Sequence, residues 1–127
     1  MAILARTFRG EVVKGKGKGA TLGYPTANID YELGDNGIET GVFWCTVRGN
    51  GFLEPGIAIV GAREDAAGQP LLEVYFLYYH EELYGKFVEV DMLERHRGIE
   101  TFSDDAALTA KIEQDVAAAK EFFKKNV

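Results

Sequence analysis

The stretch LLEVYFLYY, residues 71–79, decides the fold class of this chain. Every residue in it is apolar or aromatic except Glu73, a composition typical of a β-strand that is covered on both faces. In residues 86–93 the apolar side chains alternate with polar ones such as Glu89 and Asp91, which is the period of a half-buried strand. The sequence therefore predicts at least two strands in this region.

Four further strands are predicted towards the N-terminus, over residues 6–13, 26–31, 41–48 and 56–62. The segment GVFWCTVR, residues 41–48, is rich in β-branched and aromatic side chains, and the pair Asn50-Gly51 that follows it favours a tight turn. Six strands, most of them joined by short turns, predict a mainly β protein built as an antiparallel barrel.

The C-terminal segment has a helical period instead. Ser103 is expected to be the N-cap, with Asp104 and Asp105 in the first turn, where the helix dipole favours negative charge. Apolar residues then recur at helical spacing: Leu108, Ile112, Val116, Ala119 and Phe123. This pattern predicts one amphipathic helix packed against the barrel.

The overall composition narrows the possible functions. A chain of 127 residues fits one domain, residues 1–127, and a net charge of −6 argues against a nucleic-acid partner. No apolar run is long enough to span a membrane, and the N-terminus lacks the features of a signal peptide. The single cysteine, Cys45, fits a reducing compartment. We expect a soluble, cytoplasmic monomer, with Cys45 as a small buried apolar residue.

A glycine-rich segment, VVKGKGKGATLGYPTAN at residues 12–28, is the first candidate binding site. Glycines allow close approach of the backbone, consecutive N–H groups can bind an anion, and the interleaved lysines add positive charge. The segment matches neither the P-loop nor the dinucleotide-binding fingerprint. It suits a polyphosphate, although a flexible turn without a ligand would have the same composition.

Three side chains outside the glycines are the next candidates. Thr26 and Asn28 are two residues apart, so on a strand their oxygens face the same side, and such oxygens are ligands that Mg²⁺ accepts. Glu73 interrupts an apolar strand, and a carboxylate in apolar surroundings can serve as a base. The alternative is an edge-strand Glu73 that points to water or pairs with a lysine.

The segments VVKGKGKGATLGYPTANI, GVFWCTV, LLEVYFLYYHEELYGKFVEV, HRGIETFSDDAAL and IEQDVAAAK, in this order, resemble the riboflavin kinase (flavokinase) family over nearly the whole chain. The resemblance implies a six-stranded antiparallel Greek-key (split) barrel with a C-terminal helix, and transfer of the γ-phosphate of ATP to riboflavin, giving FMN and ADP. It implies Glu73 as the general base, Mg²⁺ on Thr26 and Asn28, and flavin near Arg97 and Glu100. It implies ATP contacts by Gly15, Gly17, Lys18, Gly19, Thr21, Gly23, Pro25, Thr26 and Tyr84.

The sequence departs from the family pattern at two places. The segment GAREDAAGQP, residues 61–70, lacks the family's Pro-Thr signature, and Ile99 stands where a glutamate is usual, with Glu100 one residue further on. Two alternatives therefore stay open: a flavin- or nucleotide-binding barrel without turnover, and a barrel kinase with another donor or another alcohol. No adenylyltransferase segment is present in these residues, so we expect synthesis to stop at FMN.

Overall fold

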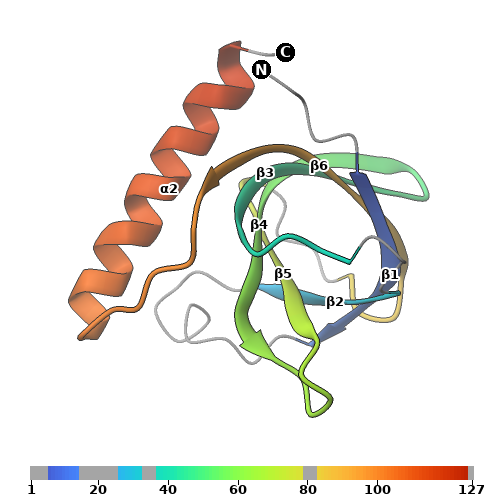
Figure 1. Cartoon of the computed structure of the whole chain (residues 1–127). Helices are drawn as coiled ribbons and strands as arrows, with labels where there is room; N and C mark the ends of the chain where they lie inside the picture. Colours follow the sequence, from blue (N-terminus) through green and yellow to red (C-terminus); the bar gives the residue numbers. More distant parts are fainter. Residues whose placement is uncertain (1–5, 15–25, 33–36, 79–82, 126–127) are drawn as a thin grey trace.

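Antiparallel strands close on themselves into a barrel, and a long helix lies along its outside (Figure 1). The computed structural model describes residues 6–14, 26–32, 37–78 and 83–125. Within these ranges the elements are, in chain order, β1 (Arg6–Lys14), β2 (Ala27–Tyr31), β3 (Gly41–Gly49), β4 (Phe52–Glu64), β5 (Pro70–Phe76), β6 (Phe87–Arg97) and α2 (Asp105–Lys125). No helix in the described ranges is both long and apolar enough to cross a membrane.

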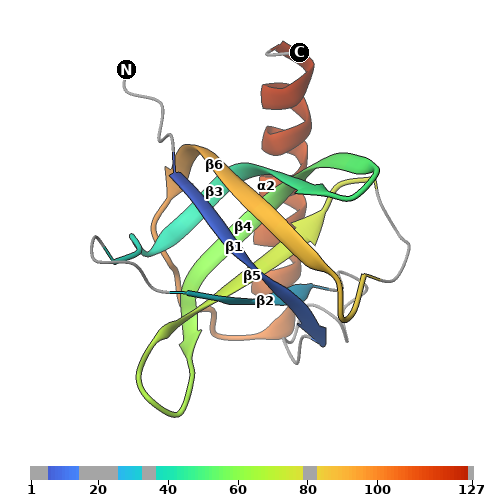
Figure 2. The same cartoon turned by 90° about the vertical axis from the view of Figure 1, so that its right-hand side faces the viewer.

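The strand order around the barrel is β1-β2-β5-β4-β3-β6, and every neighbouring pair is antiparallel. The strands β3, β4 and β5 are paired in sequence, while β6 crosses back to lie beside β3 (Figure 2). The resulting order β6-β3-β4-β5 is a Greek key. This arrangement confirms the predicted antiparallel Greek-key barrel with a C-terminal helix.

The strand boundaries differ from the predicted ones where long-range pairing extends or ends a strand. The strand β4 begins at Phe52, earlier than predicted, because the turn at Asn50-Gly51 lets Phe52 pair at once with Gly49. The strand β6 runs to Arg97 because β3 pairs with it from Glu89 to Arg97, through two bulges. The strand β5 ends at Phe76, and the predicted continuation to residue 79 is wrong over residues 77 and 78.

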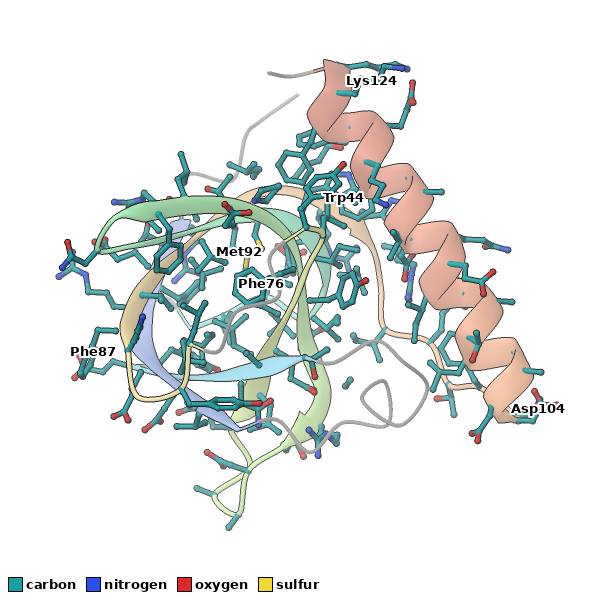
Figure 3. All side chains as sticks on the ribbon, turned by 180° about the vertical axis from the view of Figure 1, so that it is seen from behind. Trp44, Phe76, Phe87, Met92, Asp104 and Lys124 are labelled. Atoms are coloured by element: carbon teal, nitrogen blue, oxygen red, sulfur yellow. The ribbon has the colours of Figure 1, made fainter. Side chains whose placement is uncertain are left out.

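The barrel interior is filled by apolar side chains from all six strands. Leu72 and Val74 of β5 point inward, as do Phe43 of β3 and Val90 of β6, and all four are almost completely buried. Figure 3 shows Phe76 and Met92 inside the barrel, whereas Phe87 lies on its outer surface. Because side chains alternate along a strand, the intervening residues of β5, Glu73 among them, face outward.

The outward faces of β3 and β4 are covered by the helix. A second apolar cluster joins Trp44 and Ile57 of the barrel wall to Ala119 and Phe122 of α2. The helix begins at Asp105, and its N-cap is Asp104, whose carboxylate accepts a 2.8 Å hydrogen bond from the N–H of Ala107. The prediction of Ser103 as the N-cap was therefore wrong by one residue, because the carboxylate that reaches the first-turn N–H belongs to Asp104.

Candidate functional site

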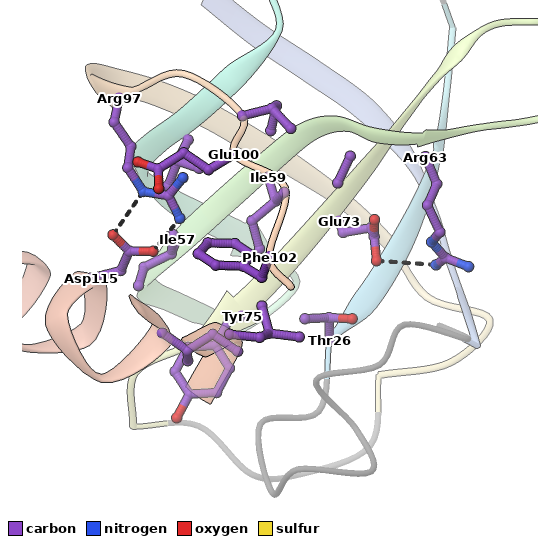
Figure 4. A pocket seen from close by; sticks show the side chains of 15 residues that line it. Thr26, Ile57, Ile59, Arg63, Glu73, Tyr75, Arg97, Glu100, Phe102 and Asp115 are labelled. Carbon is purple, nitrogen blue, oxygen red and sulfur yellow. Dashed lines mark hydrogen bonds and ion pairs between the residues drawn. The ribbon is translucent and has the colours of Figure 1, made fainter. Parts of the chain in front are cut away.

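A cavity of about 270 Å³ lies between the outer wall of the barrel and the helix side of the molecule (Figure 4). This volume is close to the lower end of small-molecule sites, roughly 300–1,000 Å³. The barrel contributes residues of β3, β4 and β5, and the opposite wall comes from Arg97 at the end of β6, from the segment after it and from α2. The lining residues are Thr26, Val42, Ile57, Ile59, Ala62, Arg63, Glu73, Tyr75, Arg97, Ile99, Glu100, Phe102, Leu108, Ile112 and Asp115.

The middle of the cavity is apolar and its polar groups gather at two ends. Ile57 and Ile59 of β4 form one wall, and Phe102 lies against the same space from the segment between β6 and α2 (Figure 4). One polar end carries Glu73 and Arg63, and the other carries Arg97 with Asp115. A planar apolar ligand with polar groups at both extremities suits this arrangement.

Glu73 is the central residue of the first polar end. Its side chain is buried, with 5% of the residue exposed, and its carboxylate accepts a 3.1 Å hydrogen bond from Nη2 of Arg63. The barrel pairs Asn28 of β2 directly with Glu73 of β5, so the two side chains lie on the same outer face. Thr26 lines the cavity beside Glu73 (Figure 4). The three predicted residues Thr26, Asn28 and Glu73 are thus brought together.

Thr26 and Asn28 fit the predicted magnesium site. The atoms Oγ1 of Thr26 and Oδ1 of Asn28 are buried, and neither has a hydrogen-bond partner within the part of the chain that the structure describes. Buried polar oxygens without partners are rare because each loses the hydrogen bonds that it makes in water. A hydroxyl and an amide oxygen are hard ligands, which Mg²⁺ accepts together with waters and phosphate oxygens. The donor set and its unsatisfied state therefore suit a cation.

The second polar end is built on a buried ion pair between β6 and α2. Arg97 donates from Nε and Nη2 to the two carboxylate oxygens of Asp115, at 3.0 and 2.6 Å, and from Nη1 to the carbonyl of Gly98. His96 lies 3.5 Å from the same carboxylate and stacks on Trp44. Burial lowers the pKa of His96, while the charge of Asp115 opposes that shift.

Glu100 completes this end of the cavity. It is largely exposed, lines the cavity and forms a 3.4 Å ion pair with Lys111 of α2. Ile99, which stands at the family's usual glutamate position, also lines the cavity. Arg97 and Glu100, the predicted flavin contacts, therefore lie at the end of the cavity opposite Glu73, where their proposed role stays a prediction.

The remaining predicted contacts are not tested by this geometry. Gly15, Gly17, Lys18, Gly19, Thr21, Gly23 and Pro25 lie outside the described residues. Tyr84 is described, but it is exposed and does not line the cavity. The N–H of its neighbour Gly85 donates a hydrogen bond to the carbonyl of Val12, near the end of β1 where the glycine-rich segment begins.

Sequence reasoning missed two charged residues of the site. Asp115 lies between Ile112 and Val116 on the inward face of the helix. A carboxylate on the apolar face of a helix indicates a partner that is buried with it. Arg63 gave no comparable signal, because its direction depends on an irregularity in β4. Val60 pairs with Leu72 and Glu64 pairs with Pro70, so residues 61–63 lie opposite Leu71 alone and the strand bulges.

Most of the chain is similar to proteins of one known family. The family model described as riboflavin kinase (flavokinase) matches residues 4–123. The chain is 36% identical over 125 residues to a bifunctional riboflavin kinase/FMN adenylyltransferase of Haemophilus influenzae, covering 95% of this chain and 40% of that protein. It is 29% identical to an RNA-binding riboflavin kinase of Bacillus subtilis, covering 91% of this chain and 50% of that protein.

Among solved structures, a riboflavin kinase from Trypanosoma brucei matches with a TM-score of 0.64 and 27% identity. That match covers 94% of this chain and 80% of the other. The two curated relatives are longer, and this chain spans half of their length or less.

Proposed function

This chain belongs to the riboflavin kinase family, and on that premise we propose that it transfers the γ-phosphate of ATP to the ribityl 5′-hydroxyl of riboflavin, giving FMN and ADP. The observation that carries the proposal is the position of Glu73. A buried carboxylate stands at the polar end of an apolar cavity, beside two buried oxygens suited to a cation. Such a site provides a base and a phosphate-binding position next to a pocket for a flat apolar ring.

The ligands are assigned by polarity. The isoalloxazine ring of riboflavin would occupy the apolar middle of the cavity, against Ile57, Ile59 and Phe102, with its polar edge towards Arg97 and Glu100. The ribityl chain would then extend towards Glu73. A cavity of about 270 Å³ holds one small molecule, so ATP would approach from the Thr26 end and meet the hydroxyl at Glu73. The glycine-rich segment and Tyr84 stay the predicted ATP contacts.

In the proposed reaction Glu73 accepts the proton of the 5′-hydroxyl. The oxygen forms a bond to the γ-phosphorus, the bond from that phosphorus to the β–γ bridging oxygen breaks, and ADP leaves. Phosphoryl transfer of this kind depends mainly on positioning and on stabilisation of charge. The buried position of Glu73 would limit the access of water to the reacting hydroxyl.

Thr26 Oγ1 and Asn28 Oδ1 would hold the magnesium ion. When bound with ATP, Mg²⁺ neutralises charge on the phosphate oxygens. Thr26→Val should weaken binding of Mg-ATP, measured by calorimetry, while leaving binding of riboflavin unchanged. Equal affinity of the variant and the wild type for Mg-ATP would argue against this ligand assignment.

The direct test is to incubate the protein with riboflavin, ATP and Mg²⁺ and to separate FMN from riboflavin by chromatography. Glu73→Gln keeps the shape of the side chain but removes the base, so the rate should fall by about 10²–10⁴-fold while riboflavin still binds. Glu64→Gln, at an exposed glutamate at the end of β4, is the matched control and should keep the wild-type rate.

Other outcomes separate the alternatives. Quenching of riboflavin fluorescence by the wild type without any FMN would favour the binding barrel without turnover, and activity only with another nucleotide or alcohol would favour the third hypothesis. Full activity of Glu73→Gln would remove Glu73 as the base. The absence of a nucleic-acid partner, the monomeric state, the cytoplasmic location and a single domain over residues 1–127 stay predictions, the first resting on the net charge of −6.

A further inference from the structure

We infer that Arg63 is a catalytic residue that binds the phosphoryl group during transfer and neutralises its charge, an inference that rests on the proposed phosphoryl transfer. Arg63 is part of the segment that departs from the family signature, and it lies at the end of the cavity that also holds Glu73, where the reaction is proposed to occur. A cation beside a transferring phosphoryl group stabilises the transition state, in which charge is spread over the equatorial oxygens.

Arg63 is the cationic side chain of the cavity wall that still has hydrogen-bond donors available. Arg63 and Arg97 are the two cationic side chains among the described residues of the cavity wall. All three guanidinium nitrogens of Arg97 donate to Asp115 or to the carbonyl of Gly98. Arg63 has one described hydrogen bond, from Nη2 to Glu73, which leaves the other donors of its planar group available for phosphate oxygens.

The distances bring the phosphoryl group within reach of Arg63. A hydroxyl that gives its proton to Glu73 must lie about 2.6–3.2 Å from the carboxylate. The attacked phosphorus lies about 3–3.5 Å beyond that hydroxyl oxygen. Nη2 of Arg63 is 3.1 Å from Oε2 of Glu73, and the Arg63 side chain is 40% exposed, so it can turn from the carboxylate to the phosphoryl oxygens.

The backbone holds Arg63 in this position. Gly61 has a φ of 90°, which favours glycine, and a Cβ there would lie 2.7 Å from Cγ2 of Thr40. The hairpin that follows is fixed by Asp65, whose carboxylate accepts hydrogen bonds from the N–H groups of Ala67 and Gln69. The bulge of β4 is thus a defined feature, and bulges next to active sites re-aim side chains.

The ion pair gives Arg63 a partner at each stage of the reaction. Before transfer, the guanidinium pairs with the ionised Glu73 and balances its buried charge. When Glu73 accepts the hydroxyl proton, the carboxylate loses its charge, and negative charge develops on the phosphoryl oxygens and on ADP. Arg63 then has an anionic partner on the phosphoryl side, so one cation serves both charges in turn.

The test is Arg63→Gln, compared with Arg95→Gln as the control. Arg95 is 41% exposed, close to the 40% of Arg63, and it forms an ion pair with Glu39 at a place outside the cavity lining. We expect kcat to fall by about 10²–10³-fold in Arg63→Gln, with the KM for riboflavin changed only a few-fold, and no change in Arg95→Gln. Guanidinium ion added to Arg63→Ala should restore part of the rate.

A pH profile distinguishes this role from a simpler one. If Arg63 only kept Glu73 ionised, the rate of Arg63→Gln would return to the wild-type level at alkaline pH, which would overturn the inference. A kcat of Arg63→Gln within a few-fold of the wild type at all pH values would also overturn it. Failure of the proposed function would look different, since the wild type itself would then form no FMN.

Binding of ADP with aluminium fluoride, a mimic of the transferring phosphoryl group, gives a readout without turnover. In the presence of riboflavin and Mg²⁺, the wild type should bind this mixture more tightly than ADP alone. Arg63→Gln should lose that difference but keep its affinity for ADP. Retention of the full difference in the variant would contradict the inference, and an unchanged melting temperature would show that the variant is folded.

Discussion

Replacement of Asp115 by asparagine should destabilise the protein because it leaves a buried arginine without its carboxylate. Asp115 and Arg97 are 8% and 17% exposed, and two hydrogen bonds of 3.0 and 2.6 Å join them. Removing one partner of a buried ion pair costs about 3–5 kcal/mol. Arg97 keeps its bond to the carbonyl of Gly98, so we expect a loss of about 3 kcal/mol in the free energy of unfolding.

The loss can be measured by urea denaturation followed by fluorescence. Trp44 is the single tryptophan of the chain and it stacks on His96, 4.2 Å between ring centroids. Because His96 lies 3.5 Å from Asp115, the emission of Trp44 reports on the surroundings of the ion pair. The melting temperature should fall by roughly 10 °C for a chain of this size. Glu113→Gln, at an exposed position on the same helix, is the matched control and should stay within about 0.5 kcal/mol of the wild type.

A double variant sharpens the test. Asp115→Asn combined with Arg97→Met removes both charges, so the double variant should lose less stability than the sum of the losses in the two single variants. Additive losses would show that the two side chains do not interact in solution. A loss below about 0.5 kcal/mol for Asp115→Asn alone would refute the reasoning that this ion pair holds α2 against the end of β6.

Three further predictions concern pH dependence, reactivity and packing. Burial lowers the pKa of His96, so as the pH falls the imidazole is protonated at a higher pH in the unfolded chain than in the native protein. Stability should therefore fall as the pH drops below about 6.5, and His96→Gln should flatten that part of the pH–stability curve. Burial also raises the pKa of the Cys45 thiol, so a thiol reagent at neutral pH should modify the native protein only as fast as it unfolds. Gly10→Ala should cost about 3 kcal/mol or more in a denaturant titration, because its Cβ would clash with the backbone carbonyl of Asp30, whereas an exposed substitution such as Arg9→Gln should cost little.

The local pattern predicted the elements because each type of element has its own period. Alternating apolar side chains marked β6, and helical spacing marked α2, before any partner was known. The ends of β4, β5 and β6 were less predictable, since the length of a strand is set by the neighbour with which it pairs. The N-cap was missed by one residue because Ser103 and Asp104 both suit that position.

The site divides in the same way between local and long-range information. The spacing of Thr26 and Asn28 placed their oxygens on one face, and the apolar surroundings of Glu73 marked it as unusual. Only the closure of the barrel sets Asn28 beside Glu73, because the pairing of β2 with β5 joins strands that are distant in the sequence. Likewise the bulge that turns Arg63 towards Glu73 comes from the pairing of β4 with β5.

The sequence by itself determined the fold class, the helix and the residue types at the Glu73 end of the cavity, since these depend on periodicity and composition. The tertiary structure alone decided that Glu73 has Arg63 as its partner, that Arg97 is held by Asp115, and that a cavity lies between the barrel and α2. The physical reason is that periodicity records which face of an element is buried, while the identity of the covering partner is fixed only when strand register and helix packing bring distant side chains into contact.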